Sequence, residues 1–210
     1  MKTLTVLSQK GGAGKTTLAL SLAVSAELTG KQTLIVDTDP QASASKWYDR
    51  RIGKTDAPYV MSGHAERLPQ ILQLAKENNA DFAIIDTAPH AQQSALQACK
   101  VADIVLIPCR ASILDLDAIQ ASVDIVKLSG KTAFVVVNAL PPQSQQRYQE
   151  LREAVPARCG ISVLDSYYAN RMDFVDATTE GLTPREFNPS GKAAEEEIRL
   201  FRWVASELSL

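Results

Sequence analysis

The stretch from Gln9 to Thr17, QKGGAGKTT, combines three glycines with two lysines and two adjacent threonines. Glycines allow successive backbone N–H groups to point at one anion, and a lysine followed by a hydroxyl side chain can hold phosphate and Mg²⁺. The common pattern, G-x-x-x-x-G-K-[ST], requires a glycine at position 9, where this chain has Gln9. An additional lysine, Lys10, lies inside the loop. The stretch therefore predicts a phosphate-binding loop of an unusual form.

The individual residues of this loop have distinct expected roles. Backbone N–H groups from Gly11 to Lys15 should face the phosphates, with help from the positive end of the helix that follows. Lys15 should neutralise the β- and γ-phosphate oxygens, and the Thr16 hydroxyl should hold Mg²⁺. The predicted nucleotide-binding residues of the loop are Lys10, Gly11, Gly12, Ala13, Gly14, Lys15, Thr16 and Thr17.

Three carboxylates follow apolar strand-like runs elsewhere in the chain. Asp86 ends FAIID, while Asp37 and Asp39 follow TLIV. Because parallel strands end at one edge of a sheet, we expect these acids to converge on the phosphate loop. Asp86 is predicted to anchor the Mg²⁺ shell through water, together with Thr16. The sequence thus predicts ligand binding at the carboxyl edge of a parallel sheet.

The elements that must position these residues alternate between strand and helix along the chain. Apolar runs predict strands at residues 3–8, 33–39, 82–88, 103–109 and 132–140, with 160–168 as a candidate further strand. Helical patterns occupy residues 15–30, 66–79, 92–102, 114–128 and 190–208. Repeated strand–helix–strand units predict an α/β three-layer sandwich, with a mostly parallel sheet covered by helices on both faces. Pro141–Pro142 and residues 182–192 are expected to be surface loops, and residues 1–210 one domain.

Composition narrows the class of protein. The chain has 210 residues and a net charge of −2, which gives no gross bias toward nucleic acid or acidic membranes. We find neither a signal peptide nor an apolar stretch that approaches the roughly 20 residues of a membrane span. The three cysteines and two histidines are scattered, so a disulfide framework or a histidine metal site is not indicated. These features predict a cytoplasmic protein with reduced thiols.

Three motifs together resemble the ParA/MinD family of deviant Walker P-loop ATPases. KGGAGKTT (10–17), DTDPQAS (37–43) and IIDTAP (84–89) match its three nucleotide motifs, and ILDLDAI (113–119) extends the likeness. DPQ is closer to the ParA branch, and the chain length is similar to that of small plasmid-type ParA proteins. The resemblance implies a Mg²⁺-dependent ATP hydrolase that is slow alone and stimulated by a partner.

The resemblance also implies roles for further residues. Lys10 would cross the interface of an ATP-bound homodimer and contact the phosphates of the partner subunit; the alternative is that it adds charge to its own loop. Asp39 would position the attacking water, and Asp37 would support the metal shell and the switch loop. Asn138 is a candidate for reading adenine, with an ordinary turn asparagine as the alternative; residues 182–191 could also line the base.

In this family the nucleotide acts as a switch. The resemblance implies that the ATP dimer binds DNA without sequence preference and is released by a ParB-like centromere-binding protein or cargo adaptor. The cargo would be a plasmid, a chromosome region or another assembly, and the protein would associate with the nucleoid in the cytoplasm. The candidate DNA contacts are Arg147, Arg152, Arg171, Arg185, Arg199 and Arg202.

Two other functions remain as alternatives. A MinD-like membrane-cycling ATPase needs a basic amphipathic helix at a terminus. The last segment carries Phe201 and Trp203 at helical spacing, but its acidic EEE flank favours packing on the core over a membrane contact. A metallocluster-dependent ATPase of the same superfamily needs a cysteine pair at the dimer interface, whereas Cys99 and Cys109 form no C-x-x-C motif.

Overall fold

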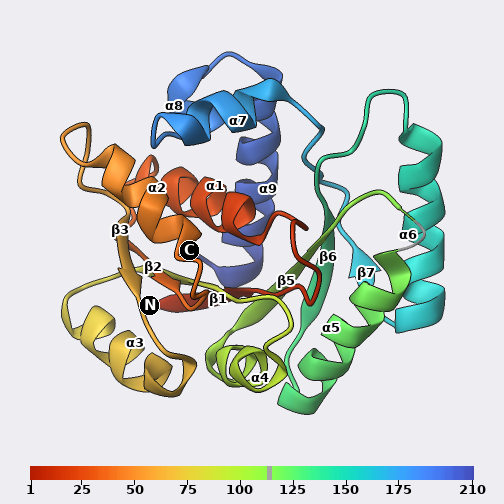
Figure 1. The fold of residues 1–210 in the computed structure, drawn as a ribbon, viewed down its shortest axis with the longest axis horizontal. Coiled ribbons are helices and arrows are strands. Elements are labelled where there is room, and N and C mark those ends of the chain that lie inside the picture. The colour runs from red at the N-terminus through yellow and green to blue at the C-terminus, as the bar shows by residue number, and fades with distance from the viewer. Residues whose placement is uncertain (113–114) are drawn as a thin grey trace.

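The computed structural model describes residues 1–112 and 115–210. Ile113 and Leu114, the first two residues of the ILDLDAI stretch, lie outside the described residues. Seven strands form one sheet in the order β3-β2-β4-β1-β5-β6-β7, and every adjacent pair is parallel (Figure 1). The strands are β1 Lys2–Val6, β2 Thr33–Asp37, β3 Tyr59–Ser62, β4 Phe82–Asp86, β5 Ile104–Cys109, β6 Ala133–Val137 and β7 Ser162–Val163.

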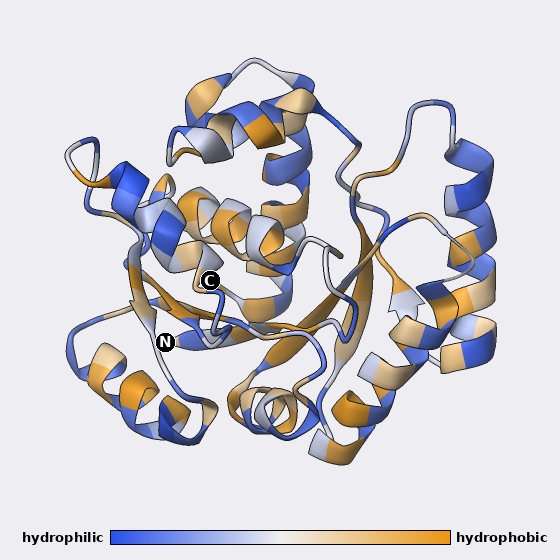
Figure 2. Cartoon of the chain, in the orientation of Figure 1, coloured by the Kyte–Doolittle hydropathy of each residue, from blue (hydrophilic) through white to orange (hydrophobic). Residues whose placement is uncertain are grey.

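Two layers of helices cover this sheet, as the sequence predicts (Figure 1). One layer contains α1 Lys15–Glu27, α2 Ser43–Arg51, α7 Met172–Thr179, α8 Pro184–Phe187 and α9 Lys192–Leu208. The other contains α3 Leu68–Glu77, which follows the 3-10 helix η1 Ala65–Arg67, together with α4 Gln92–Val101, α5 Leu116–Ser129 and α6 Gln145–Cys159. The helices turn apolar sides toward the sheet and polar sides outward (Figure 2). The predicted α/β three-layer fold is confirmed.

The central strands are buried on both faces. In β4, Phe82 and Ile84 pack in the cluster that contains α1 and α9, whereas Ala83 and Ile85 pack in the cluster that contains α3. Successive side chains of a strand point to opposite faces, so both sets of positions must be apolar when both faces are covered. This explains why the strands are continuous apolar runs in the sequence.

The strands and helices predicted from the sequence are present, but several other elements were missed. The five predicted strands correspond to β1, β2, β4, β5 and β6, and the candidate strand at 160–168 is the two-residue β7. Among the described residues, five elements were not predicted, namely α2, β3, α6, α7 and α8. The expected loop at 182–192 contains α8, whose N-terminus is held by a capping box between Thr183 and Glu186.

Helix α9 is part of the core, as the sequence favoured, and two of the three glutamates in its acidic flank are buried with it. Phe201 is buried, and the Trp203 ring packs edge-on against Phe134 at 4.8 Å between centroids. Glu196 and Glu197 have 2% and 0% exposure, whereas Glu195 is exposed. The burial has a physical reason, because both carboxylates accept backbone N–H groups, from Ala169 and Arg185 respectively. None of the helices in the described parts of the chain has the length and apolarity to cross a membrane.

Buried Glu197 generates a prediction about stability. Burial raises the pKa of Glu197 to about 8, so the folded protein retains a proton that the unfolded chain releases above its ordinary pKa of 4.5. This group therefore makes the free energy of unfolding decrease as pH rises from 4.5 to about 8, by up to about 1.4 kcal/mol per pH unit. We expect the free energy of unfolding, measured with urea, to decrease less between pH 5 and pH 8 in Glu197→Gln than in the original protein. Parallel pH profiles of the two proteins would contradict the assignment.

Candidate functional site

The phosphate loop connects β1 to α1 at the carboxyl edge of the sheet. Gly12 and Gly14 have φ values of +71° and +97°, a region that L side chains rarely adopt. At Gly14 a Cβ atom would also lie 1.8 Å from Nδ2 of Asn138, so the loop requires glycine there. The loop thus places its backbone directly against the end of β6.

Asn138 holds the phosphate loop from the side. Its Nδ2 donates a hydrogen bond to the carbonyl of Ala13 at 3.0 Å, and its backbone N–H donates to Cys109 at 2.7 Å. The sequence suggested that Asn138 reads the base. In the structure its side-chain amide nitrogen holds the loop and its backbone N–H holds the end of β5, while base reading by Asn138 stays a prediction.

Thr16 and Asp86 meet beside the loop. The Thr16 hydroxyl donates to Asp86 Oδ2 at 2.6 Å, whereas the buried Asp86 Oδ1 has no hydrogen-bond partner among the described residues. Burial raises the pKa of Asp86 to about 7, although the Thr16 hydrogen bond and the Lys15 charge oppose the shift. Burial also lowers the pKa of Lys15, which the nearby Asp86 and Asp39 charges oppose. The sequence correctly expected Lys15, Thr16 and Asp86 to come together.

These groups fit a magnesium ion bound together with phosphate. The unpartnered Asp86 oxygen and the Thr16 hydroxyl are hard oxygen donors, the type that Mg²⁺ prefers. The described residues contain no group of three or more His, Cys, Asp or Glu side chains able to hold a metal. A cation at this place would therefore take most of its ligands from phosphate and water, as Mg²⁺ does in nucleotide sites.

The two acids after β2 lie in different environments. Asp37 is buried, and its oxygens accept backbone N–H groups of Asp39, Ala44 and Ser45. It therefore fixes the start of α2 and residues 38–42, the segment expected to be the switch loop. Burial raises the pKa of Asp37 despite these hydrogen bonds. Asp39 instead lines the hollow of the phosphate loop, while its Oδ1 accepts the Gln41 N–H. This geometry supports the loop role expected for Asp37 more directly than its expected metal role.

Lys10 does not line the hollow formed by its own loop. Its ammonium group forms an ion pair with Asp115, whose side chain is 1% exposed, whereas the Lys10 side chain is 44% exposed. The other Asp115 oxygen accepts the backbone N–H of Arg110 at 3.2 Å. Lys10 is thus held at the surface, beside the phosphate loop.

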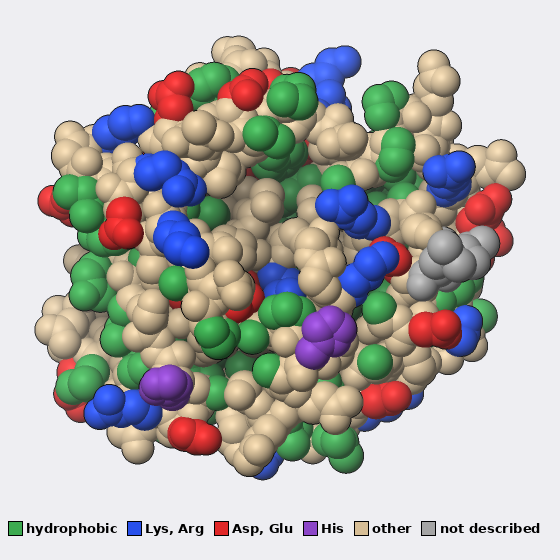
Figure 3. All heavy atoms as spheres, viewed as in Figure 1, with side chains coloured by type: hydrophobic (Ala, Val, Ile, Leu, Met, Phe, Trp, Pro, Cys, Tyr) green, Lys and Arg blue, Asp and Glu red, His purple; other side chains and the backbone are tan. Residues whose placement is uncertain are grey.

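The hollow at the loop has a volume of about 690 Å³ and extends well past the phosphate end. Lys and Arg side chains gather around it (Figure 3). The lining residues that the sequence missed are Lys46 and Arg50 from α2, Arg110 after β5, residues 169–171, and Phe174, Val175 and Thr178 from α7. No motif marks these residues, and the helices α2 and α7, which carry five of them, were not predicted.

A buried carboxylate of α9 holds one wall of this hollow. Glu196 Oε2 accepts the Ala169 N–H at 3.0 Å, and Oε1 accepts Nε and Nη2 of Arg171 at 2.9 and 2.7 Å. Charge-assisted hydrogen bonds are among the stronger ones in proteins. Helix α9 therefore helps to position the segment that faces the nucleotide hollow.

The six candidate DNA-contacting arginines divide into two groups. Arg152 pairs with Asp165, Arg171 pairs with Glu196, and Arg185 donates to the Ser25 carbonyl. The other three are exposed and form no ion pair with any described residue; they are Arg147, Arg199 and Arg202. Cys99 and Cys109, considered for a metallocluster, are both buried.

Comparison with known proteins identifies the class of molecule. Residues 4–183 match the family model for the CobQ/CobB/MinD/ParA nucleotide binding domain, and the chain belongs to this family. The predicted ParA/MinD membership is thereby confirmed. At the level of the family, the chain is a nucleotide-binding protein. The septum site-determining protein MinD of Pyrococcus horikoshii OT3, which has a similar fold at 20% identity and a TM-score of 0.74, was solved in complex with Mg-ADP.

Individual relatives and solved structures agree with this class. The chain is 30% identical to Maintenance of carboxysome distribution protein A of Halothiobacillus neapolitanus, covering 93% of this chain and 92% of the relative. It is 32% identical to the protein of the same name from Gloeobacter kilaueensis, covering 99% and 94%. The fold is similar to that of the MinD cell division protein of Aquifex aeolicus, with a TM-score of 0.79, 17% identity and 98% coverage of both chains.

Replacement of Asn138 distinguishes its two candidate roles, which are holding the phosphate loop and reading the base. If Asn138 mainly holds Ala13, Asn138→Ala should weaken binding of ATP, GTP and tripolyphosphate alike, by roughly 3- to 10-fold, because one partly buried hydrogen bond is lost. Isothermal titration with the three ligands measures this. A loss confined to ATP would show instead that Asn138 reads the base.

Proposed function

We propose that residues 1–210 form a single ATPase domain that acts as a nucleotide-switched positioning protein. In this proposal two copies associate when ATP is bound, the pair binds DNA without sequence preference, and an adaptor on a cargo triggers hydrolysis and release. The observation that carries the proposal is the position of Lys10, which is held at the surface beside the phosphate loop and outside its own nucleotide hollow.

A lysine in this position is suited to act on a second copy. Two phosphate loops that face each other would bring two highly charged triphosphates together, and that repulsion must be offset by cations. Lys10, offered from each copy to the other, would supply such a cation and make association depend on the phosphates present. The partly exposed ion pair with Asp115 would hold the ammonium group at the surface until the two copies associate.

Within one copy, the other residues of the nucleotide site would have separate roles. When bound, ATP with Mg²⁺ supplies the phosphoryl group for transfer to water. Lys15 would neutralise phosphate oxygens, while Thr16 and Asp86 would hold the metal shell. Asp39 lies in the hollow and would orient the attacking water. Asp37 would hold the switch loop in place through its three backbone contacts.

The DNA contacts in this proposal come from arginines that the protein does not use internally. Arg147 of α6 and Arg199 and Arg202 of α9 are exposed and can reach phosphate oxygens. Pairing of two copies doubles their number, which would make binding depend on the nucleotide. Arginine contacts to the DNA backbone position a protein without reading sequence. DNA binding of this kind would place the protein on the nucleoid.

The relatives suggest the class of cargo. Two proteins that are 30% and 32% identical over most of the chain are named for carboxysome distribution. We therefore favour a protein assembly over a plasmid as the cargo, recognised through an adaptor analogous to a ParB-like protein. Helix α9 uses its apolar side inside the protein, where Phe201 and Leu200 are buried, and this supports DNA over a membrane as the binding surface.

Binding of the Asp39→Ala protein to random-sequence duplex DNA tests this proposal. We expect binding with Mg-ATP but not with Mg-ADP, because the variant should pair with a second copy and stall before hydrolysis. With three arginines from each of two copies, affinity should fall by about 10³-fold between 50 and 200 mM salt. Fluorescence anisotropy across a salt series measures both effects.

Matched arginine variants locate the contacts. In the Asp39→Ala background, Arg199→Ala with Arg202→Ala should lower the slope of log affinity against log salt, since phosphate contacts are removed. Arg152→Ala should leave that slope unchanged, because Arg152 is paired with Asp165. Absence of DNA binding in both nucleotide states would overturn the DNA part of the proposal.

A further inference from the structure

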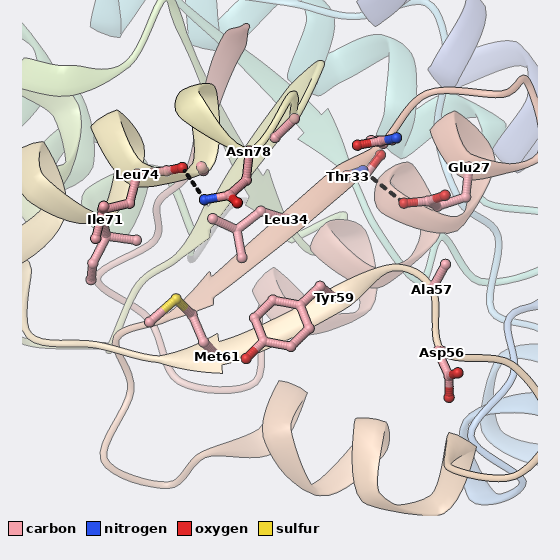
Figure 4. A pocket seen from close by; sticks show the side chains of 13 residues that line it. Glu27, Thr33, Leu34, Asp56, Ala57, Tyr59, Met61, Ile71, Leu74 and Asn78 are labelled. Atoms are coloured by element: carbon pink, nitrogen blue, oxygen red, sulfur yellow. Dashed lines mark hydrogen bonds between the residues drawn. The ribbon is translucent and has the colours of Figure 1, made fainter.

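A second hollow lies at the opposite end of the sheet from the phosphate loop. It has a volume of about 460 Å³ and opens between α3 and the edge strand β3 (Figure 4). Thr33 and Leu34 at the start of β2 and Tyr59 at the start of β3 line it, whereas the phosphate loop follows the carboxyl end of β1. The hollow therefore shares no residues with the nucleotide site.

The two ends of this hollow differ in chemistry. Figure 4 shows Met61, Ile71 and Leu74 together at one end, with the Tyr59 ring in the middle. The carboxylates of Glu27 and Asp56 lie at the other end. Tyr59 and Leu74 are each 58% exposed, so a large part of the apolar surface is in contact with water. A volume of several hundred Å³, apolar walls and a few polar groups at one end are typical of small-molecule sites.

The acidic end carries negative charge that the protein does not neutralise. No Lys, Arg or His lines the hollow, and neither carboxylate is in an ion pair within the described parts of the chain. Glu27 accepts the Thr33 N–H at 2.7 Å, and partial burial raises the pKa of this carboxyl. Arg51 is near enough to lower that pKa, but its guanidinium binds Glu186 and two backbone carbonyls.

We propose that this hollow binds a small organic cation, an ammonium or guanidinium group carried on an aromatic or branched aliphatic body. The apolar body would lie against Leu74, Met61 and the Tyr59 ring, and the cation would reach the carboxylates of Glu27 and Asp56. Burial of the exposed apolar surface supplies affinity, and the unneutralised acids supply selectivity for a cation over an anion. This site is independent of the proposed DNA and dimer functions, because it lies at the other end of the sheet.

Titration of the full chain with phenethylamine tests the proposal. Phenylacetate, with a ring of the same kind and the opposite charge, and N-acetylphenethylamine, which is neutral, are the matched controls. We expect saturable binding of phenethylamine at one site, with amide NMR shifts centred on β3 and α3. Binding of the neutral control should be about fivefold weaker, because one partly exposed ion pair is lost, and phenylacetate should not bind.

Variants locate the site within the chain. Ala75→Phe should abolish binding by filling the hollow, whereas Gln73→Phe, an exposed position on α3 outside the lining, should not. Glu27→Gln keeps an acceptor for Thr33 and removes the charge, so phenethylamine should bind this variant as weakly as the neutral compound binds the original. Asp56→Asn, at an exposed position, should act in the same direction without affecting folding.

Three results would overturn the proposal. The first is equal binding of phenethylamine and phenylacetate, and the second is binding that both Glu27→Gln and Asp56→Asn leave unchanged. The third is self-association of the chain that Ala75→Phe abolishes, which would make the hollow an interface between copies.

Discussion

The contact between the Thr16 hydroxyl and the buried Asp86 carboxylate is the interaction on which the site depends. It forms because β1 and β4 are parallel neighbours in which Val6 pairs with Asp86, so the phosphate loop leaves the sheet beside that acid. One Asp86 oxygen has no partner, and an unpaired buried charge is costly. A bound cation would offset that cost, so this edge of the sheet is suited to bind a metal ion together with phosphate groups.

The surrounding structure keeps this edge in one arrangement. Asn138 holds the phosphate loop, Asp37 holds the switch loop, and Glu196 holds the wall at residues 169–171. Each of these contacts joins a side chain to backbone groups of a neighbouring segment, which fixes a loop more firmly than packing alone. Lys10 differs from these residues, because its ion pair with Asp115 leaves the side chain 44% exposed and available to another molecule.

The parts of the fold that the sequence predicted are those specified by local patterns. The central strands are unbroken apolar runs, and the phosphate loop has its glycines and lysine in fixed order, so Lys15, Thr16 and Asp86 could be placed together. Helix α2 has the polar sequence SASKWYDRR and is held by tertiary contacts, such as the hydrogen bond from Trp47 to the Leu182 carbonyl, which no local pattern reveals. Likewise, the sequence EEE shows that these residues are acidic but not whether their side chains are buried. Glu196 and Glu197 could therefore not be recognised as interior groups.

The central claim, that Lys10 couples association to the nucleotide of a second copy, is tested most directly by sedimentation velocity. The measurement compares Asp39→Ala with the double variant Lys10→Ala/Asp39→Ala, each in Mg-ATP and in Mg-ADP. The account predicts that Asp39→Ala is a dimer in ATP alone, and that the double variant binds ATP but stays monomeric. A double variant that still dimerises with ATP would contradict the role of Lys10 in the partner's site.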